Sequence, residues 1–136
     1  MRVILDTNVF ISGIFFSGPP YQILKAWKNG KIKLVVSYEI LDEYQRVGEE
    51  LSNRFNDIEI GPFIELLLFE SEIIDTSKVN DRICSDPDDD KFIHCALAGK
   101  CKFIISGDTH LKAIDGYKKI KVLSPRRFVE QYLSNK

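Results

Sequence analysis

Four acidic residues occupy positions from which their carboxylates can converge, although they lie far apart in the chain: Asp6, Glu43, Asp90 and Asp108. Carboxylates a few ångströms apart raise one another's pKa, so keeping all of them ionised costs free energy. A divalent cation removes that cost, and Mg²⁺ prefers hard oxygen ligands while keeping several waters. Because a bound metal ion can generate a hydroxide and stabilise a leaving oxygen, the pattern favours metal-assisted hydrolysis of a phosphodiester.

Two of these acids follow short apolar segments, one directly and one after two residues. Asp6 follows residues 2–5 and Asp108 follows residues 103–105, after a Ser-Gly turn. Both segments have the composition of buried parallel strands, and the carboxyl ends of such strands open the ligand crevice of an α/β sheet. Each acid has a simpler interpretation as well, because Asp6 also suits a helix N-cap and Asp108 also suits a turn.

The other two acids are expected on helices that begin at the same edge. Glu43 falls in the second turn of the helix predicted after strand 33–36, where Glu39 and Asp42 are alternatives and a solvated role is open. Asp90 falls in the first turn of a helix that begins near Asp88, and it reaches the crevice only if the preceding loop delivers it there. In the acidic run at 86–90 some members suit the helix dipole alone, and Asp89 is the main rival as a ligand.

The whole chain predicts an α/β protein, because short apolar runs alternate with helical patterns. The expected strands are 2–5, 33–36, 72–75, 103–105 and 120–123, and the expected helices are 21–28, 37–50, 62–70, 88–99 and 124–133, with a short helix or turn after Asp6. This order predicts a three-layer αβα sandwich with a central parallel sheet of roughly five strands. With 136 residues and no linker or repeat, we expect one domain over residues 1–136.

Composition excludes several classes of protein. The net charge is −1, but residues 1–36 carry +4, residues 37–90 carry −12 and residues 91–136 carry +7. This distribution is compatible with an acidic site between basic flanks and equally with an unevenly charged, solvated surface. The three cysteines lack the spacing of a zinc site or a disulfide framework and are expected to be reduced packing residues. No apolar run approaches a membrane span, and no signal peptide is evident, so a cytoplasmic location without membrane contact is expected.

Two other enzyme classes place an Asp after the first strand. An aspartyl-nucleophile phosphatase needs a second acid two residues later as general acid, and Asn8 stands there. A response-regulator receiver needs an acidic pair near the first strand and a phospho-accepting Asp midway along the chain, and neither is evident. Both classes are therefore disfavoured.

Four segments, in order and covering nearly the whole chain, resemble a known family. They are LDTNVFIS near the start, SYEILDEY in the first third, DPDDDKFIHCALAG and FIISGDTHL. Together they are similar to PIN-domain ribonucleases, as found in the toxins of type II (VapC-like) toxin–antitoxin pairs. The resemblance implies a PIN-like fold and endonucleolytic cleavage of single-stranded RNA with Mg²⁺ or Mn²⁺ as cofactor.

The resemblance also implies roles for individual residues. The catalytic, metal-binding acids would be Asp6, Glu43, Asp90 and Asp108, with Asn8, Ser106 and Asp89 as supporting polar residues. His94 lies where the family usually has a small residue, and a hydrogen-bonded structural histidine is the expected role.

Partners follow from the resemblance and from the basic residues. Candidate RNA contacts are Lys25 and Lys28, because cations beside an aromatic such as Trp27 can track a backbone and stack a base, although a core position for Trp27 is slightly preferred. Lys112 is a further candidate from a second basic group near the end of the chain, and His110 is expected as a rim residue, with an RNA contact as the alternative. The resemblance implies a small antitoxin and a homodimer, with the exposed face of helix 62–69 as a docking surface if it is not core. The alternative function is a non-catalytic RNA-binding or protein-interaction PIN module with a decayed metal site.

Overall fold

A computed structural model describes residues 1–54 and 58–134 of the chain. Within them a five-stranded, entirely parallel sheet has the order β3-β2-β1-β4-β5. The strands are β1 (Arg2–Leu5), β2 (Lys33–Ser37), β3 (Ser71–Ile74), β4 (Phe103–Ile105) and β5 (Lys121–Leu123). The predicted strands are thus confirmed to within a residue at each end.

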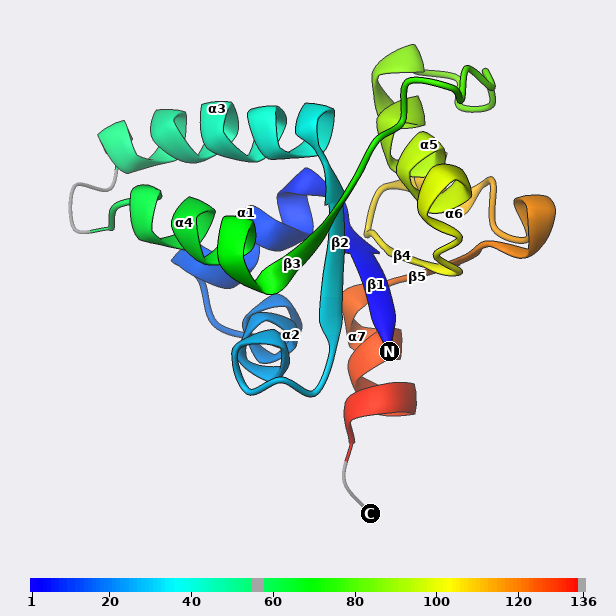
Figure 1. Cartoon of the computed structure of the whole chain (residues 1–136). Helices are drawn as coiled ribbons and strands as arrows, with labels where there is room; N and C mark the ends of the chain where they lie inside the picture. The colour runs from blue at the N-terminus through cyan, green and yellow to red at the C-terminus, as the bar shows by residue number, and fades with distance from the viewer. Residues whose placement is uncertain (55–57, 135–136) are drawn as a thin grey trace.

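Helices cover both faces of this sheet, and the predicted α/β sandwich is confirmed. Figure 1 shows α5 and α6 on one side of the sheet and α1 to α4 on the other. The helices are α1 (Thr7–Phe15), α2 (Pro19–Lys28), α3 (Tyr38–Arg54), α4 (Gly61–Glu70), α5 (Asp90–Gly99), α6 (Thr109–Lys112) and α7 (Pro125–Phe128). Two 3₁₀ turns, η1 (Pro87–Asp89) and η2 (Tyr117–Lys119), and a π-helical segment, η3 (Val129–Leu133), complete the described elements.

The centre of the sheet is buried on both faces, as its uninterrupted apolar strands require. Ile4 and Ile104 are fully buried on the neighbouring strands β1 and β4. On one face, Phe10 of α1 stacks on Tyr44 of α3 with ring centroids 4.2 Å apart. The Tyr44 hydroxyl donates a hydrogen bond to the carbonyl of Leu5, so this aromatic pair fixes α1 and α3 against the end of β1.

The strand order creates a crevice beside β1. The chain places β2 and β3 on one side of β1 and then returns to add β4 and β5 on the other. In open parallel sheets, ligands bind at the carboxyl ends of the strands where the order reverses. Leu5 pairs with Ile105 here, and the Asp6 amide donates to the Ile105 carbonyl at 3.0 Å. The residues that follow β1 and β4 therefore emerge side by side.

The structure differs from the predicted elements in four places. The helix α3 runs to Arg54 instead of ending near residue 50. Pro19 and Pro20 form the first turn of α2 rather than a break before it, because proline suits the first helical positions. The short elements α6 and η2 were not predicted, since four residues or fewer carry no hydrophobic period. The last predicted helix changes from α to π geometry after Phe128.

Other expectations concern single residues and membrane contact. Trp27 is a core residue with 3% exposure, as preferred, and its indole N–H donates to the Glu70 carbonyl. All three cysteines are free, and Cys95 and Cys101 are buried. Among the described residues, no helix combines the length and apolar character that crossing a membrane requires.

Candidate metal centre

A small polar pocket lies at the carboxyl edge of β1 and β4. Its volume is about 100 Å³, which suits a cation with a few waters better than a nucleotide. It is lined by Asp6, Thr7, Asn8, Glu43, Val47, Asp89, Phe92, Asp108 and Leu111. Four of the lining residues are acids from four separate segments, and three of them, Asp6, Glu43 and Asp108, are among the four acids that the sequence predicted to converge.

Asp6 is the most buried of the pocket acids. It is 4% exposed, and its Oδ1 accepts a hydrogen bond from the Val9 amide at 2.8 Å, which makes it the N-cap of α1. Its Oδ2 accepts a hydrogen bond from the Ser106 hydroxyl. The helix-cap and pocket interpretations of Asp6 are therefore compatible, because one oxygen caps the helix while the carboxylate lines the pocket.

The environment of Asp6 favours a neutral group. Burial raises the pKa of Asp6 most strongly, and the charges of Asp108 and Glu43 add to it, against the hydrogen bonds from Ser106 and Val9. A buried carboxylate that is destabilised by its neighbours gains from a bound cation. The pocket thus fits the chemistry of a divalent ion.

Ser106 links the two acids that follow the strands. Its side chain is fully buried, donates to Asp6 and accepts a hydrogen bond from the Asp108 amide at 2.9 Å. Asp108 in turn caps α6, because its Oδ1 accepts from the His110 amide at 2.8 Å. Each strand-end acid therefore accepts a hydrogen bond from a backbone amide, and Ser106 connects the two acids.

Glu43 enters the pocket from α3 with both oxygens engaged. The Thr7 hydroxyl donates to Oε2, and the Lys91 ammonium donates to Oε1. Arg46, one turn along α3 and mostly exposed, lies 3.9 Å from Oε1. Glu43 is therefore already partly neutralised by side chains of the protein.

The acidic run before α5 divides its members between different partners. Asp89 lines the pocket, whereas Asp90 is not among the lining residues. Asp90 is 4% exposed, and its Oδ1 accepts hydrogen bonds from the amides of Ile83 and Cys84 at 3.2 and 2.8 Å. Of the two neighbouring acids, Asp89 therefore lines the pocket, whereas Asp90 binds the backbone of the preceding loop.

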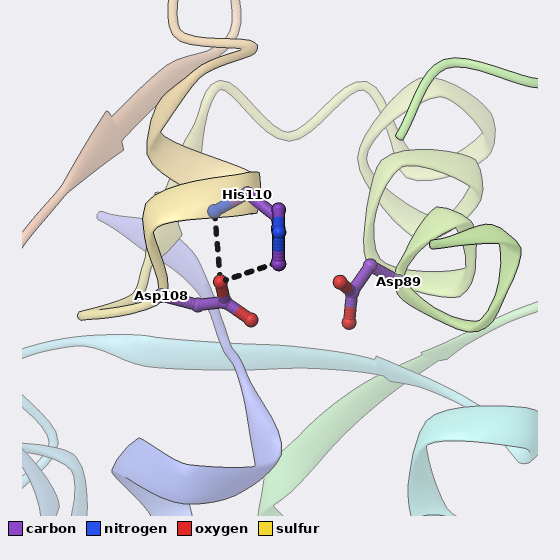
Figure 2. Close-up of side chains that lie close together, drawn as sticks. All are labelled: Asp89, Asp108 and His110. Atoms are coloured by element: carbon purple, nitrogen blue, oxygen red, sulfur yellow. Dashed lines mark hydrogen bonds and ion pairs between the residues drawn. The ribbon is translucent and has the colours of Figure 1, made fainter. Parts of the chain in front are cut away.

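Asp89 and Asp108 face each other with His110 beside them (Figure 2). One ligand atom from each of the three residues lies within 4.8 Å of the others. The pKa of Asp89 rises to about 6, because of burial first and then the charges of Asp108, Asp86 and Asp88, while His110 opposes the shift. This donor set of two carboxylates and an imidazole is chemically suited to a metal ion.

Lys91 supplies the positive charge inside the site. Its ammonium pairs with Glu43 and, at 3.1 Å, with Asp88, and its side chain is 14% exposed. Burial lowers the pKa of Lys91, but the hydrogen bonds and charges of these two acids outweigh burial, so the pKa is raised overall. Lys91 therefore remains charged and neutralises one side of the pocket.

Replacing Lys91 with Met is expected to make the protein depend more strongly on divalent ions. Without the ammonium, Glu43 keeps only the Thr7 hydroxyl and the more distant, mostly exposed Arg46, and the metal-free protein should lose about 1–3 kcal/mol of stability. Thermal unfolding in EDTA and in Mn²⁺ measures this, and Mn²⁺ should raise the midpoint further in Lys91→Met than in the parent. Lys102→Met, which removes the same charge at an exposed position, is the control. Equal responses in both variants would contradict the role of Lys91.

The remaining predicted residues have different locations. Asn8 and His110 lie at the pocket and its rim, and Lys112 is exposed on α6. Lys25 lines a separate cavity of about 440 Å³, and Lys28 lies over the Phe63 ring, both on the last turn of α2, which leads to the amino end of β2. The structure therefore does not bring Lys25 and Lys28 to the pocket.

His94 and three other residues complete the comparison with the sequence. His94 Nε2 lies 2.6 Å from the Asp81 carbonyl oxygen, in agreement with its expected structural role. Thr7, Arg46 and Lys91 contact the pocket acid Glu43 and were not singled out in the sequence. The available signal was their position, because Thr7 directly follows Asp6 and Lys91 directly follows the acidic run.

Comparisons with known proteins agree with this architecture. A family model described as PIN domain matches residues 2–110. The uncharacterized protein MJ1680 of Methanocaldococcus jannaschii is 32% identical over 148 residues, which cover 97% of this chain and 92% of that protein. The fold also resembles the crystal structure of VapBC2 from Rickettsia felis bound to a DNA fragment from their promoter, with a TM-score of 0.56, 17% identity, and coverage of 91% of this chain and 98% of that chain.

The extent of the family match and the relative's identity over nearly the whole chain decide the classification. PIN nucleases generally use divalent metals, which fits the carboxylates and imidazole around the pocket. The chain belongs to the PIN domain family, whose members are generally nucleases.

Proposed function

We propose that the protein is a metal-dependent endoribonuclease that hydrolyses phosphodiester bonds of single-stranded RNA. The observation that carries the proposal is the meeting of four carboxylates in one pocket at the strand-order reversal: Asp6, Glu43, Asp89 and Asp108. Asp89 takes the place first given to Asp90, because Asp89 lines the pocket. Mg²⁺ or Mn²⁺ is the proposed cofactor, and it would supply an activated water and charge stabilisation at the cleaved phosphate.

The residues of the chain perform the remaining tasks. Ser106 and the Val9 amide hold the Asp6 carboxylate in one orientation, and Thr7 does the same for Glu43. Such prearranged acids lose little freedom when an ion binds. Arg46, mostly exposed beside the pocket, offers a cationic contact to a phosphate lying across it.

A cleavage assay with matched substrates tests the proposal. Untagged protein is incubated with single-stranded RNAs and DNAs of the same sequence in Mg²⁺, Mn²⁺ or EDTA, beside Asp6→Asn protein purified identically. We expect internal cleavage of RNA, intact DNA and no cleavage in EDTA. Equal cleavage by both proteins would indicate a contaminant. Binding of RNA without cleavage in any metal would favour the alternative, a non-catalytic module with a decayed site.

A role as the toxin of a toxin–antitoxin pair extends the proposal. It is supported by the fold shared with a chain of the VapBC2 complex and by apolar side chains on α4, where Leu68 is 53% and Phe69 84% exposed while Leu67 is buried. We propose a small antitoxin and a homodimer as partners. Growth arrest on expression of the parent, but not of Asp6→Asn, and a dimer in sedimentation are expected; unaffected growth or a monomer would overturn the respective part.

A further inference from the structure

Asp89 is the pocket acid whose charge the described residues leave without a direct partner. Both oxygens of Asp6 and both oxygens of Glu43 accept hydrogen bonds from protein groups. Within residues 1–54 and 58–134, no group donates a hydrogen bond or forms an ion pair to the Asp89 carboxylate. The part of the pocket with unused carboxylate oxygen is therefore the side formed by Asp89 and Asp108.

His110 is fixed at this side of the pocket. Its amide is bound by Asp108, and the next residue, Leu111, is 1% exposed and anchors α6 in the core. The ring reaches back to the same acid, with Nδ1 3.3 Å from Asp108 Oδ1, and its side chain is 60% exposed. Figure 2 shows the imidazole beside the gap between the two carboxylates. The ring is thus positioned by the backbone and accessible to an ion from solvent.

We propose that the imidazole of His110 is a ligand of the divalent ion held by Asp89 and Asp108, so that the site selects Mn²⁺ over Mg²⁺. The inference rests on the proposed metal dependence and deepens it by naming a nitrogen ligand and its consequence for ion choice. Mg²⁺ binds oxygen ligands and retains its waters, whereas an imidazole donor favours first-row transition ions. An all-carboxylate site would not make this distinction as strongly.

Pulsed electron paramagnetic resonance of Mn²⁺ tests the ligand directly, because it detects coupling of the ion to a ligand nitrogen. Untagged parent, His110→Ala and Thr109→Ala proteins are each loaded with one equivalent of Mn²⁺. Thr109 is the exposed neighbour of His110 on α6 and serves as the matched control. We expect imidazole nitrogen coupling in the parent and in Thr109→Ala, and its loss in His110→Ala.

Calorimetric titration measures the consequence for selectivity. The ratio of Mn²⁺ to Mg²⁺ affinity should fall about tenfold or more in His110→Ala, a magnitude typical of disturbing a metal site. His110→Asp should restore Mn²⁺ affinity through an oxygen donor without restoring the preference over Mg²⁺.

The two measurements separate this inference from the proposed function. Bound Mn²⁺ without nitrogen coupling, with an unchanged affinity ratio in His110→Ala, would overturn the role of His110 while leaving a metal-dependent nuclease intact. Failure of the parent to bind either ion would overturn both. Metal-dependent RNA cleavage by the same samples reports on the proposed function independently of the nitrogen ligand.

Discussion

The Asp6→Asn protein should cleave RNA at least about 100-fold more slowly than the parent while being more stable without metal. A metal ion contributes several kcal/mol of charge stabilisation in such reactions, and each 1.36 kcal/mol corresponds to a factor of ten in rate. The amide keeps the size of the side chain and an oxygen for the Val9 amide, so the cap of α1 is retained. The loss would therefore report on charge rather than on folding.

The gain in stability has a definite dependence on pH. Burial raises the pKa of Asp6 above its unfolded value, so the unfolded chain loses its proton first as pH increases. The metal-free parent should consequently lose stability as pH rises from about 3.8 through the raised pKa, and Asp6→Asn should lose less. Thermal unfolding in EDTA across this range measures the difference. An Asp6→Asn protein that is less stable than the parent at neutral pH, or equally active, would contradict the assignment.

The second prediction separates two adjacent acids by a matched pair of substitutions. Asp89→Asn should abolish Mn²⁺ binding and RNA cleavage without loss of stability, because Asp89 lines the pocket and burial with neighbouring acids raises its pKa to about 6. Asp90→Asn should keep Mn²⁺ affinity within a fewfold, since the Asp90 carboxylate faces the amides of Ile83 and Cys84.

The stability of the Asp90 variants provides the complementary readout. Asp90→Ala leaves two backbone amides without their acceptor and should cost about 3 kcal/mol, as hydrogen bonds to charged groups contribute about 1.5–3 kcal/mol. Calorimetric Mn²⁺ titration and chemical unfolding of all three variants show which of the two acids binds the ion and which stabilises the loop. If Asp90→Asn lost Mn²⁺ binding as completely as Asp89→Asn, Asp90 would be the ligand that the family resemblance implies.

The location of the strand-end acids could be predicted from the sequence, because it follows from the order of the strands. Asp6 and Asp108 follow β1 and β4, and because these strands are adjacent and parallel, the residues after them lie at the same edge of the sheet. The choice between Asp89 and Asp90 could not be made in this way. It depends on the rotation of a 3₁₀ turn entering α5, and consecutive residues of the same type leave that rotation undetermined.

Other features depended on contacts that no local pattern encodes. Lys91 reaches Glu43 across 48 positions of sequence, and no spacing pattern links two residues so far apart. In the sequence, Lys25 and Lys28 flank Trp27 in a pattern typical of a nucleic-acid contact. In the structure, however, the indole is buried in the core, and both lysines lie near the amino end of β2. Burying the large Trp27 ring stabilises the fold, and the buried ring is not available to stack on a base.

The run Asp88–Asp89–Asp90 also has a consequence for how the gene tolerates change. Successive residues of a helical turn are rotated by about 100–120°, so three identical side chains point to three partners. Asp88 pairs with Lys91, Asp89 lines the pocket and Asp90 binds the loop amides. Deleting one of these three codons would leave an acidic run of nearly the same composition, but it would shift every partner by one position. Sequence alignments that place a gap at different positions within this run match the same residue types, but they assign different residues to the pocket, to Lys91 and to the loop amides.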